Sequence, residues 1–139
     1  FREAIKSMEE KLPKKRTAIM KISVRQKLLD SYNVNQIPMG ELMEISPLSI
    51  IGYHVGKTNS LSREKRREIL CDFLTLSIPS HFPGEYRKSW GMPSTDARRR
   101  KTISWIRYQA KMRRANSSKK YAVAIREWEE DADFIERLI

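Results

Sequence analysis

Cysteine and histidine are scarce in this chain. Its 139 residues include one cysteine, Cys71, and two histidines, His54 and His81. One cysteine cannot form an internal disulfide, and so few thiol and imidazole groups cannot assemble a Cys/His zinc site. Cys71 lies in the apolar run 69–74, so we expect it to be a buried small hydrophobe. The sequence thus excludes disulfide-stapled and zinc-based classes and predicts a reducing, cytoplasmic location.

Long apolar runs are also lacking. No segment approaches the roughly 20 apolar residues of a membrane span, and no signal peptide is visible, so we expect no membrane partner. The chain starts at Phe1 without an initiator Met, already inside an amphipathic pattern. We therefore expect it to be the C-terminal part of a longer protein of bacterial or mobile-element type. With 40% hydrophobic residues, it is nevertheless long enough to bury one core as a single domain.

Acidic residues are missing from one region. Residues 97–120 contain ten Lys and Arg and no Asp or Glu, whereas 121–139 contain six acids. The whole chain has 28 basic and 17 acidic residues, a net charge of +11. A surplus of this size favours phosphate backbones, because binding releases their condensed counterions. The charge predicts nucleic acid as the partner, with DNA preferred over RNA.

Helical spacing of apolar residues dominates the chain, and no sustained β alternation is present. We predict an all-α bundle of about five to six helices in one domain. N-terminal helices (Phe1 to Leu12, then about Thr17 to Tyr32) occupy 1–37, and a loop rich in Pro and Gly occupies 79–93. Residues 38–78 are predicted to hold a helix-turn-helix and its following helix, and 94–139 a helical hairpin.

Two serines mark helix starts between these segments. Ser46 precedes Pro47, the pairing of an N-cap with proline at the first helical position. Ser62 is predicted to cap a helix that ends near Leu76. Gly56 to Ser60 form the turn between them.

Residues 38–70 suggest a helix-turn-helix. Gly40 supplies the small residue where two helices meet, with Met39, Met43, Ile45, Ile50 and Tyr53 as core positions. The stretch resembles the headpiece of lactose-repressor-type regulators, with 46–56 similar to their recognition helix, although Glu44 stands where the turn normally has glycine. The resemblance implies DNA contacts from exposed residues of that helix, Ser49 and His54 among them.

The first helix of the predicted hairpin carries a basic ridge. Arg100, Ser104, Arg107, Lys111 and Arg114 lie within about 40° of one line at 100° per residue. A helix packed on both flanks would still present this ridge to water, as a phosphate-tracking surface requires. The predicted nucleic-acid-binding residues are Arg63, Lys65, Arg67, Arg98, Arg99, Arg100, Lys101, Arg107, Lys111 and Arg114, together with Ser49, His54 and Lys57.

The last helix supplies the rival interpretation. Tyr121, Ile125, Trp128, Ala132, Ile135 and Ile139 form one apolar stripe, and Glu127, Glu130, Asp131 and Asp133 lie on the opposite, solvated side. The basic ridge could pair with these acids. The alternative function is then an assembly domain that docks on an acidic partner or on other domains or subunits of its parent protein.

Catalytic patterns are weak. Tyr53-His54-Val55-Gly56 resembles the second half of the GIY-YIG nuclease signature, which would imply catalytic roles for Tyr53 and Arg66 and a glutamate as metal ligand, but no first half precedes it. Gly56-Lys57-Thr58 lacks the earlier glycine of a phosphate loop, because residue 51 is Ile. We predict no catalytic residues, no metal site and no cofactor for this chain.

Overall fold

The structure is a computed structural model that describes residues 18–58 and 60–138. These residues form seven helices and no strand, which confirms the all-α prediction. The expected helix from Phe1 to Leu12 lies outside the described residues. The helices are α2 (Ala18–Asp30), α3 (Met39–Glu44), α4 (Pro47–Ile50), α5 (Arg63–Thr75), α6 (Gly84–Trp90), α7 (Asp96–Ser117) and α8 (Ala122–Glu136). None of the described helices is both long and apolar enough to cross a membrane.

Side-chain caps start three of these helices. The Oγ of Ser46 accepts from the backbone N of Leu48 at 3.0 Å, and the Oγ of Ser62 accepts from that of Lys65 at 3.1 Å. Thr95 does the same for α7 through the backbone N of Arg98. Each cap satisfies an N–H that has no partner within the helix. The predicted starts at Ser46 and Ser62 are confirmed.

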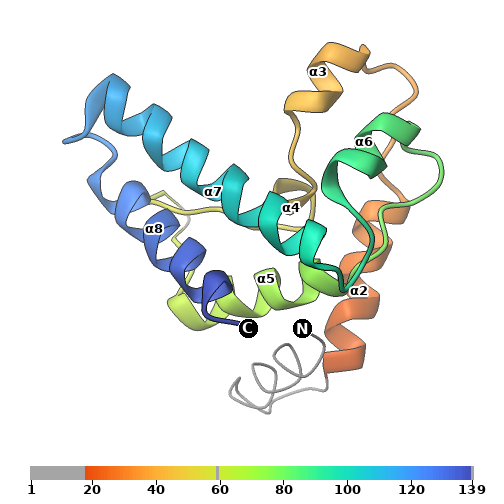
Figure 1. Cartoon of the computed structure of the whole chain (residues 1–139), viewed down its shortest axis with the longest axis horizontal. Helices are drawn as coiled ribbons and strands as arrows, with labels where there is room; N and C mark the ends of the chain where they lie inside the picture. The colour runs from red at the N-terminus through yellow and green to blue at the C-terminus, as the bar shows by residue number, and fades with distance from the viewer. Residues whose placement is uncertain (1–17, 59, 139) are drawn as a thin grey trace.

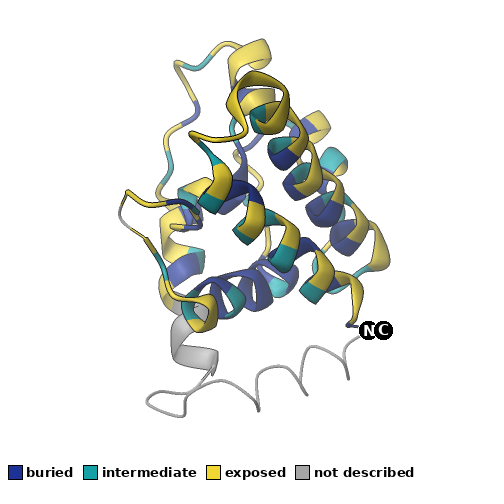
Figure 2. Cartoon of the chain, turned by 90° about the vertical axis from the view of Figure 1, so that its left-hand side faces the viewer, coloured by how far each residue is buried: buried dark blue, intermediate teal, exposed yellow. Residues whose placement is uncertain are grey.

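The long helices enclose one core. Figure 1 shows α7 and α8 side by side and antiparallel, with α5 crossing below them and α2 on the far side of α5. The buried positions of these helices turn toward the centre (Figure 2). Leu70, Phe73 and Leu74 of α5 are fully buried, and so are Ile106 of α7 and Ile135 of α8.

A buried ion pair joins α2 to α5. The guanidinium of Arg25 bonds the carboxylates of Glu68, at 3.0 Å, and Asp72, and all three residues are buried. The side chain of Gln26 extends the join by bonding both the N–H and the C=O of Ser77. Cys71 of the same helix is fully buried, as predicted for a small hydrophobe.

The prediction of a loop over 79–93 is wrong in part, because α6 forms at its centre. Pro83 precedes the helix with an extended backbone, and Gly91 ends it at φ 76°, a left-handed conformation that favours glycine. Tyr86 and Trp90 are buried, and the hydroxyl of Tyr86 donates to the carbonyl of Ile45 at 2.6 Å. Tertiary burial of these two rings outweighs the weak helix propensity of the segment.

The expected recognition helix over 46–56 is a single turn. Helix α4 ends at Ile50, and Gly52 follows at φ 99°. Tyr53 is buried as expected, but Met39 and Met43, expected in the shared core, are 44% and 42% exposed. The physical reason is that α3 has only six residues and buries only Leu42. No helix of the length that enters a DNA groove is present at 38–56.

The side chain of Arg98 lies at the centre of the fold. It is 0% exposed, and its guanidinium donates to the carbonyls of Phe73 at 2.7 Å and Leu76 at 2.8 Å. It also donates to the carbonyls of Trp90 at 2.9 Å and Gly91 at 3.0 Å. These carbonyls come from the C-terminal ends of α5 and α6, where backbone acceptors lack helical partners and the dipole favours a cation. Burial lowers the pKa of Arg98 to about 10, so it stays charged at neutral pH.

We predict that Arg98→Met lowers the free energy of unfolding by about 3 kcal/mol or more, because it leaves several buried carbonyls without a donor. Urea denaturation followed by circular dichroism measures the effect. Arg100→Met is the matched control: Arg100 is on the same helix and its side chain is 77% exposed. An equal loss in both variants would contradict the bridging role of Arg98.

Candidate nucleic-acid interface

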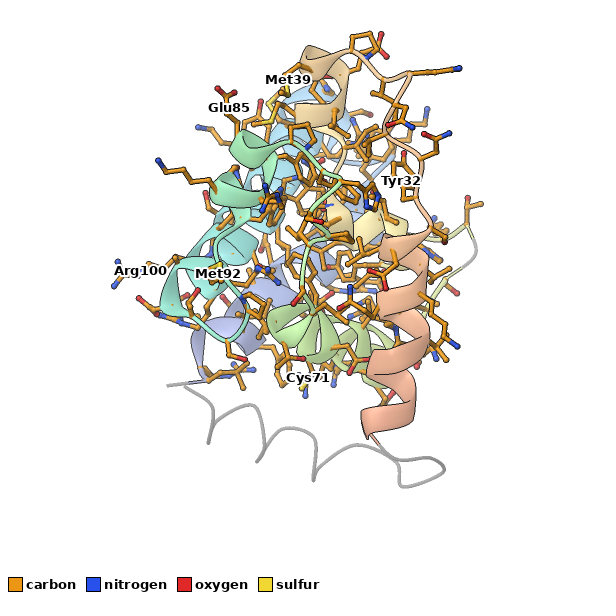
Figure 3. The ribbon with its side chains drawn as sticks, turned by 90° about the vertical axis from the view of Figure 1, so that its right-hand side faces the viewer. Tyr32, Met39, Cys71, Glu85, Met92 and Arg100 are labelled. Atoms are coloured by element: carbon orange, nitrogen blue, oxygen red, sulfur yellow. The ribbon has the colours of Figure 1, made fainter. Side chains whose placement is uncertain are left out.

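The predicted ridge on α7 is a real exposed face. Arg100, Ser104, Arg107, Lys111 and Arg114 are all exposed, and Arg100 points away from the molecule in Figure 3. One flank packs as expected, since Ile103, Ile106 and Ala110 are buried. The other flank departs from the prediction of a helix wedged on both sides, because Tyr108 is 56% exposed and Met112 39% exposed. The open face of α7 is therefore wider than the ridge.

Carboxylates already pair three of the ridge arginines. Arg107 bonds Glu136 and, at 3.4 Å, Asp133, and Arg114 bonds Glu129. Arg100 pairs with Asp96 one turn earlier, at 2.6 Å. The bond to Glu136 raises the pKa of Arg107 above its usual value. These pairs are solvent-exposed, so each contributes about 1 kcal/mol at most. A phosphate can therefore displace the carboxylate from its arginine.

Two of the predicted contact residues are buried, and that part of the prediction is wrong. Arg98 is enclosed by the carbonyls described above, and Arg99 is 6% exposed and bonds Asp96. Neither guanidinium can lie along a phosphate backbone. The adjacent Lys101 is half-buried, with its ammonium 5.1 Å from the centre of the Trp90 ring.

The cations of α5 do not share a face with the ridge. Arg63 pairs with Glu130 at 3.0 Å, Lys65 pairs with Glu68 at 3.4 Å, and the guanidinium of Arg67 lies 4.3 Å from the centre of the Phe134 ring. Burial lowers the pKa of Arg67.

Helix α8 separates the two cationic sets. Two sets of its residues contact the neighbouring helices: 127, 130, 131 and 134 contact α5, and 129, 133 and 136 contact α7. With a rotation of about 100° per residue, the two sets lie at opposite edges of the buried face of α8. A single flat surface of Lys and Arg from both α5 and α7 is therefore excluded.

The acidic side of α8 is solvated only in part, because Asp133 is exposed but Asp131 and Glu127 are not. Asp131 is 0% exposed, and its Oδ2 accepts from the hydroxyl of Tyr53 at 2.7 Å and from the Nε of Arg66 at 2.9 Å. The Nη1 of Arg66 also donates to Glu127 at 2.8 Å, whose other oxygen accepts from the backbone N of Gly56 at 2.8 Å. This buried network holds segment 53–56 and α5 against α8.

That network also accounts for the residues that resemble a nuclease signature. Arg66 does bond a glutamate, Glu127, but Tyr53 and Arg66 are both buried and both donate to Asp131. Burial raises the pKa of Tyr53 well above its usual value, with the charge of Asp131 adding to the shift, so the hydroxyl stays protonated and acts as a donor. Within 18–58 and 60–138, no cluster of three or more His, Cys, Asp or Glu residues has the geometry to hold a metal ion.

The two DNA contacts predicted from the helix-turn-helix, Ser49 and His54, lie on the single turn of α4 and on the loop after it. Ser49 donates its hydroxyl to the carbonyl of Ser46 at 2.6 Å, and the Nδ1 of His54 lies 3.1 Å from the carbonyl of Gly52. Lys57 is exposed and faces a groove that the sequence did not predict.

This groove lies between segment 53–58 and the α7–α8 turn and has a volume of about 490 Å³. Three cations line it, and none of its lining residues is acidic. Aromatic and small apolar side chains form the rest of its walls. We define the basic groove by Lys57, Arg113, Lys120, Trp105, Tyr121 and Trp128, with Tyr53, His54, Val55, Gly56, Thr58, Val123 and Ala124 completing the lining.

Two of these cations lie over one aromatic ring. The guanidinium of Arg113 is 5.1 Å, and the ammonium of Lys120 5.4 Å, from the centre of the Tyr121 ring. The sequence contains one signal for this cluster, because Tyr121 directly follows the acid-free stretch 97–120. The groove itself brings residues 53–58 together with residues between 105 and 128, and helical periodicity does not report contacts between segments so far apart in sequence.

Comparison of the chain with protein-family models, with curated proteins and with solved structures finds no match in any of the three.

We predict that Tyr53→Phe lowers the free energy of unfolding by about 1–3 kcal/mol, because Asp131 loses one of its two donors while it stays buried. Urea denaturation at neutral pH measures the change. Tyr108→Phe removes a hydroxyl from an exposed ring and serves as the control. A Tyr53→Phe protein as stable as the parent would contradict the role assigned to this hydroxyl.

The pH dependence of stability offers a second check on the buried network. Burial raises the pKa of Asp131 above 3.8, although the bonds from Arg66 and Tyr53 oppose the shift. A raised carboxyl pKa means that the folded state binds the proton more readily. The contribution of Asp131 to stability is therefore greatest below pH 3.8 and declines as the pH rises through its folded pKa.

Asp131→Asn, which stays neutral, should remove this decline. We expect the difference in unfolding free energy between parent and variant to shift in favour of the variant as the pH rises from about 3.8 toward neutrality. Denaturation midpoints at several pH values measure it. A pH-independent difference would show that the carboxyl is not perturbed in the fold.

Proposed function

We propose that this chain is a non-catalytic module that binds nucleic acid through the outer face of α7 and the α7–α8 turn. The observation that carries the proposal is the distribution of ion pairs around α8. All six acids of residues 121–139 already pair with arginines, three with α5 and three with α7. No carboxylate of that helix is left to neutralise the turn.

The turn keeps its charge as a result. Lys111, Arg113, Lys119 and Lys120 form no ion pair with any residue in the described part of the chain, and three of the four side chains are exposed. Together with Arg114, whose exposed pair is weak, they concentrate positive charge at one end of the molecule. Such a patch recruits a polyanion and releases its counterions.

A preference for DNA is not part of the proposal. That preference depended on a recognition helix, and α4 has only four residues. Exposed arginine and lysine side chains contact the phosphates of DNA and RNA alike. The assembly-domain alternative is not favoured either, since the carboxylates that occupy Arg107 come from α8 of the same chain.

We predict that the chain binds oligonucleotides at about 50 mM salt with an affinity that falls steeply as salt rises. Lys111→Gln should weaken binding and reduce the slope of log affinity against log salt by about 0.7 to 0.9, the value for one lost phosphate contact. Fluorescence polarisation with labelled duplex and single strands of DNA and RNA measures both quantities.

Lys27→Gln is the matched control, because it removes the same charge from an exposed lysine of α2. Helix α2 lies at the opposite side of the molecule from the α7–α8 turn (Figure 1). Equal losses in the two variants would mean that only net charge matters. If no strand of either kind bound at low salt, the proposed function would be refuted.

A further inference from the structure

The basic groove differs from the ridge in two respects. Acids of α8 pair with the ridge arginines Arg107 and Arg114, whereas no carboxylate lines the groove. A hollow of about 540 Å³ on the ridge is lined by arginines and by Glu136 but by no aromatic side chain. The groove, of about 490 Å³, has aromatic walls and lies within the size range of sites for small organic molecules. The groove is thus suited to a ligand that inserts a group, not only to one that lies across the surface.

The chemistry of the walls describes that ligand. Trp105, Tyr121 and Trp128 are half-buried, so each ring is held by packing while part of it faces the groove. Val55, Val123 and Ala124 add apolar surface, which favours a flat, uncharged group. Lys57 and Lys120 are exposed at the groove, where they can meet negative charge. The ligand must therefore combine an aromatic group with an adjacent anion.

We propose that the basic groove holds one unpaired nucleotide of a single strand, with the base against the aromatic side chains and its phosphate near Lys57 and Lys120. This inference depends on the proposed function and adds to it a preference for strands with unpaired bases. In a duplex the bases are stacked on one another inside the helix, so none can enter the groove. Stacking of a base on an aromatic side chain is tolerant of base identity, because every base has a π face.

The guanidinium of Arg113 has a defined part in this arrangement. It lies over the Tyr121 ring, and a stacked guanidinium keeps its N–H groups in plane and free to donate to phosphate oxygens. Arg113 and Tyr121 therefore meet at the edge of the groove. Lys120, over the same ring at 5.4 Å, adds a charge.

The test compares three ligands: an oligothymidylate of about 15 nucleotides, an abasic oligomer with the same number of phosphates, and a duplex of the same length. We expect the oligothymidylate to bind more tightly than the abasic oligomer and to quench the fluorescence of the intact chain. Two of its three tryptophans, Trp105 and Trp128, line the groove, while Trp90 is 3% exposed.

Substitutions then locate the site. Tyr121→Leu should lower the affinity for oligothymidylate about tenfold or more, with changes of no more than about twofold for the duplex and the abasic oligomer. Tyr108→Leu is the aromatic control, since Tyr108 is exposed on the same helix as Trp105 but does not line the groove. Equal losses from both substitutions would place the base on the open face of α7 and overturn the proposal.

A pair of adjacent lysines keeps the test independent of folding, because both are exposed. Lys120 lines the groove and Lys119 does not. Lys120→Gln should lower the ratio of single-strand to duplex affinity, whereas Lys119→Gln should lower both affinities together and leave the ratio unchanged. An unchanged ratio in both variants would overturn the proposal.

The remaining outcomes separate the two proposals. Tight duplex binding, together with single-strand binding that Tyr121→Leu and Lys120→Gln weaken no more than they weaken duplex binding, would refute the groove site and leave the proposed function standing. Absence of binding to all three ligands would refute both. Displacement of the oligothymidylate by poly-glutamate of equal charge would show that the groove accepts an acidic peptide instead of a nucleotide, and would overturn the inference.

Discussion

The buried guanidinium of Arg98 is the contact on which the arrangement of the helices depends. It binds backbone carbonyls at the ends of α5 and α6 from the first turn of α7, so three helices meet at one charged group. A cation without a carboxylate partner is tolerated there because helix C-termini present several unpaired acceptors and a negative dipole end. The direction in which α7 leaves this junction then decides which of its residues face α8 and which face water.

Electrostatic pairing across α8 determines where positive charge remains. Arg66 takes two carboxylates in the interior, Arg63 takes a third, and the arginines of α7 take the other three at the surface. A net charge of +11 could have been spread evenly over the molecule. It is instead least compensated at the α7–α8 turn, beside the aromatic walls of the basic groove. A hollow on the ridge is also lined by arginines, but it contains the carboxylate of Glu136 and no aromatic side chain.

Local signals predicted much of the fold. The serine caps at 46 and 62 and the apolar stripe of α8 were sufficient to place helix starts and the hairpin, since capping and periodicity involve neighbours in the chain. They failed where distant contacts decide the outcome. Helix α6 exists because Tyr86 and Trp90 enter the core, and α4 stops after one turn although its start was placed correctly. The prediction that Arg98 and Arg99 belong to a binding surface is wrong because arginine is usually exposed. The sequence does not show that hydrogen-bond acceptors surround these two side chains in the fold.

The helical class, the single buried cysteine and the contrast between a basic and an acidic segment follow from composition and spacing. Those properties can be predicted from the sequence and the geometry of a single helix, without any contact between helices. Tertiary packing decides which arginines are exposed and which acids are already paired. It also creates the groove between 53–58 and the α7–α8 turn. The reason is physical: the cost of burying a charge and the reach of an ion pair depend on distances between segments far apart in sequence, and no local pattern encodes those distances.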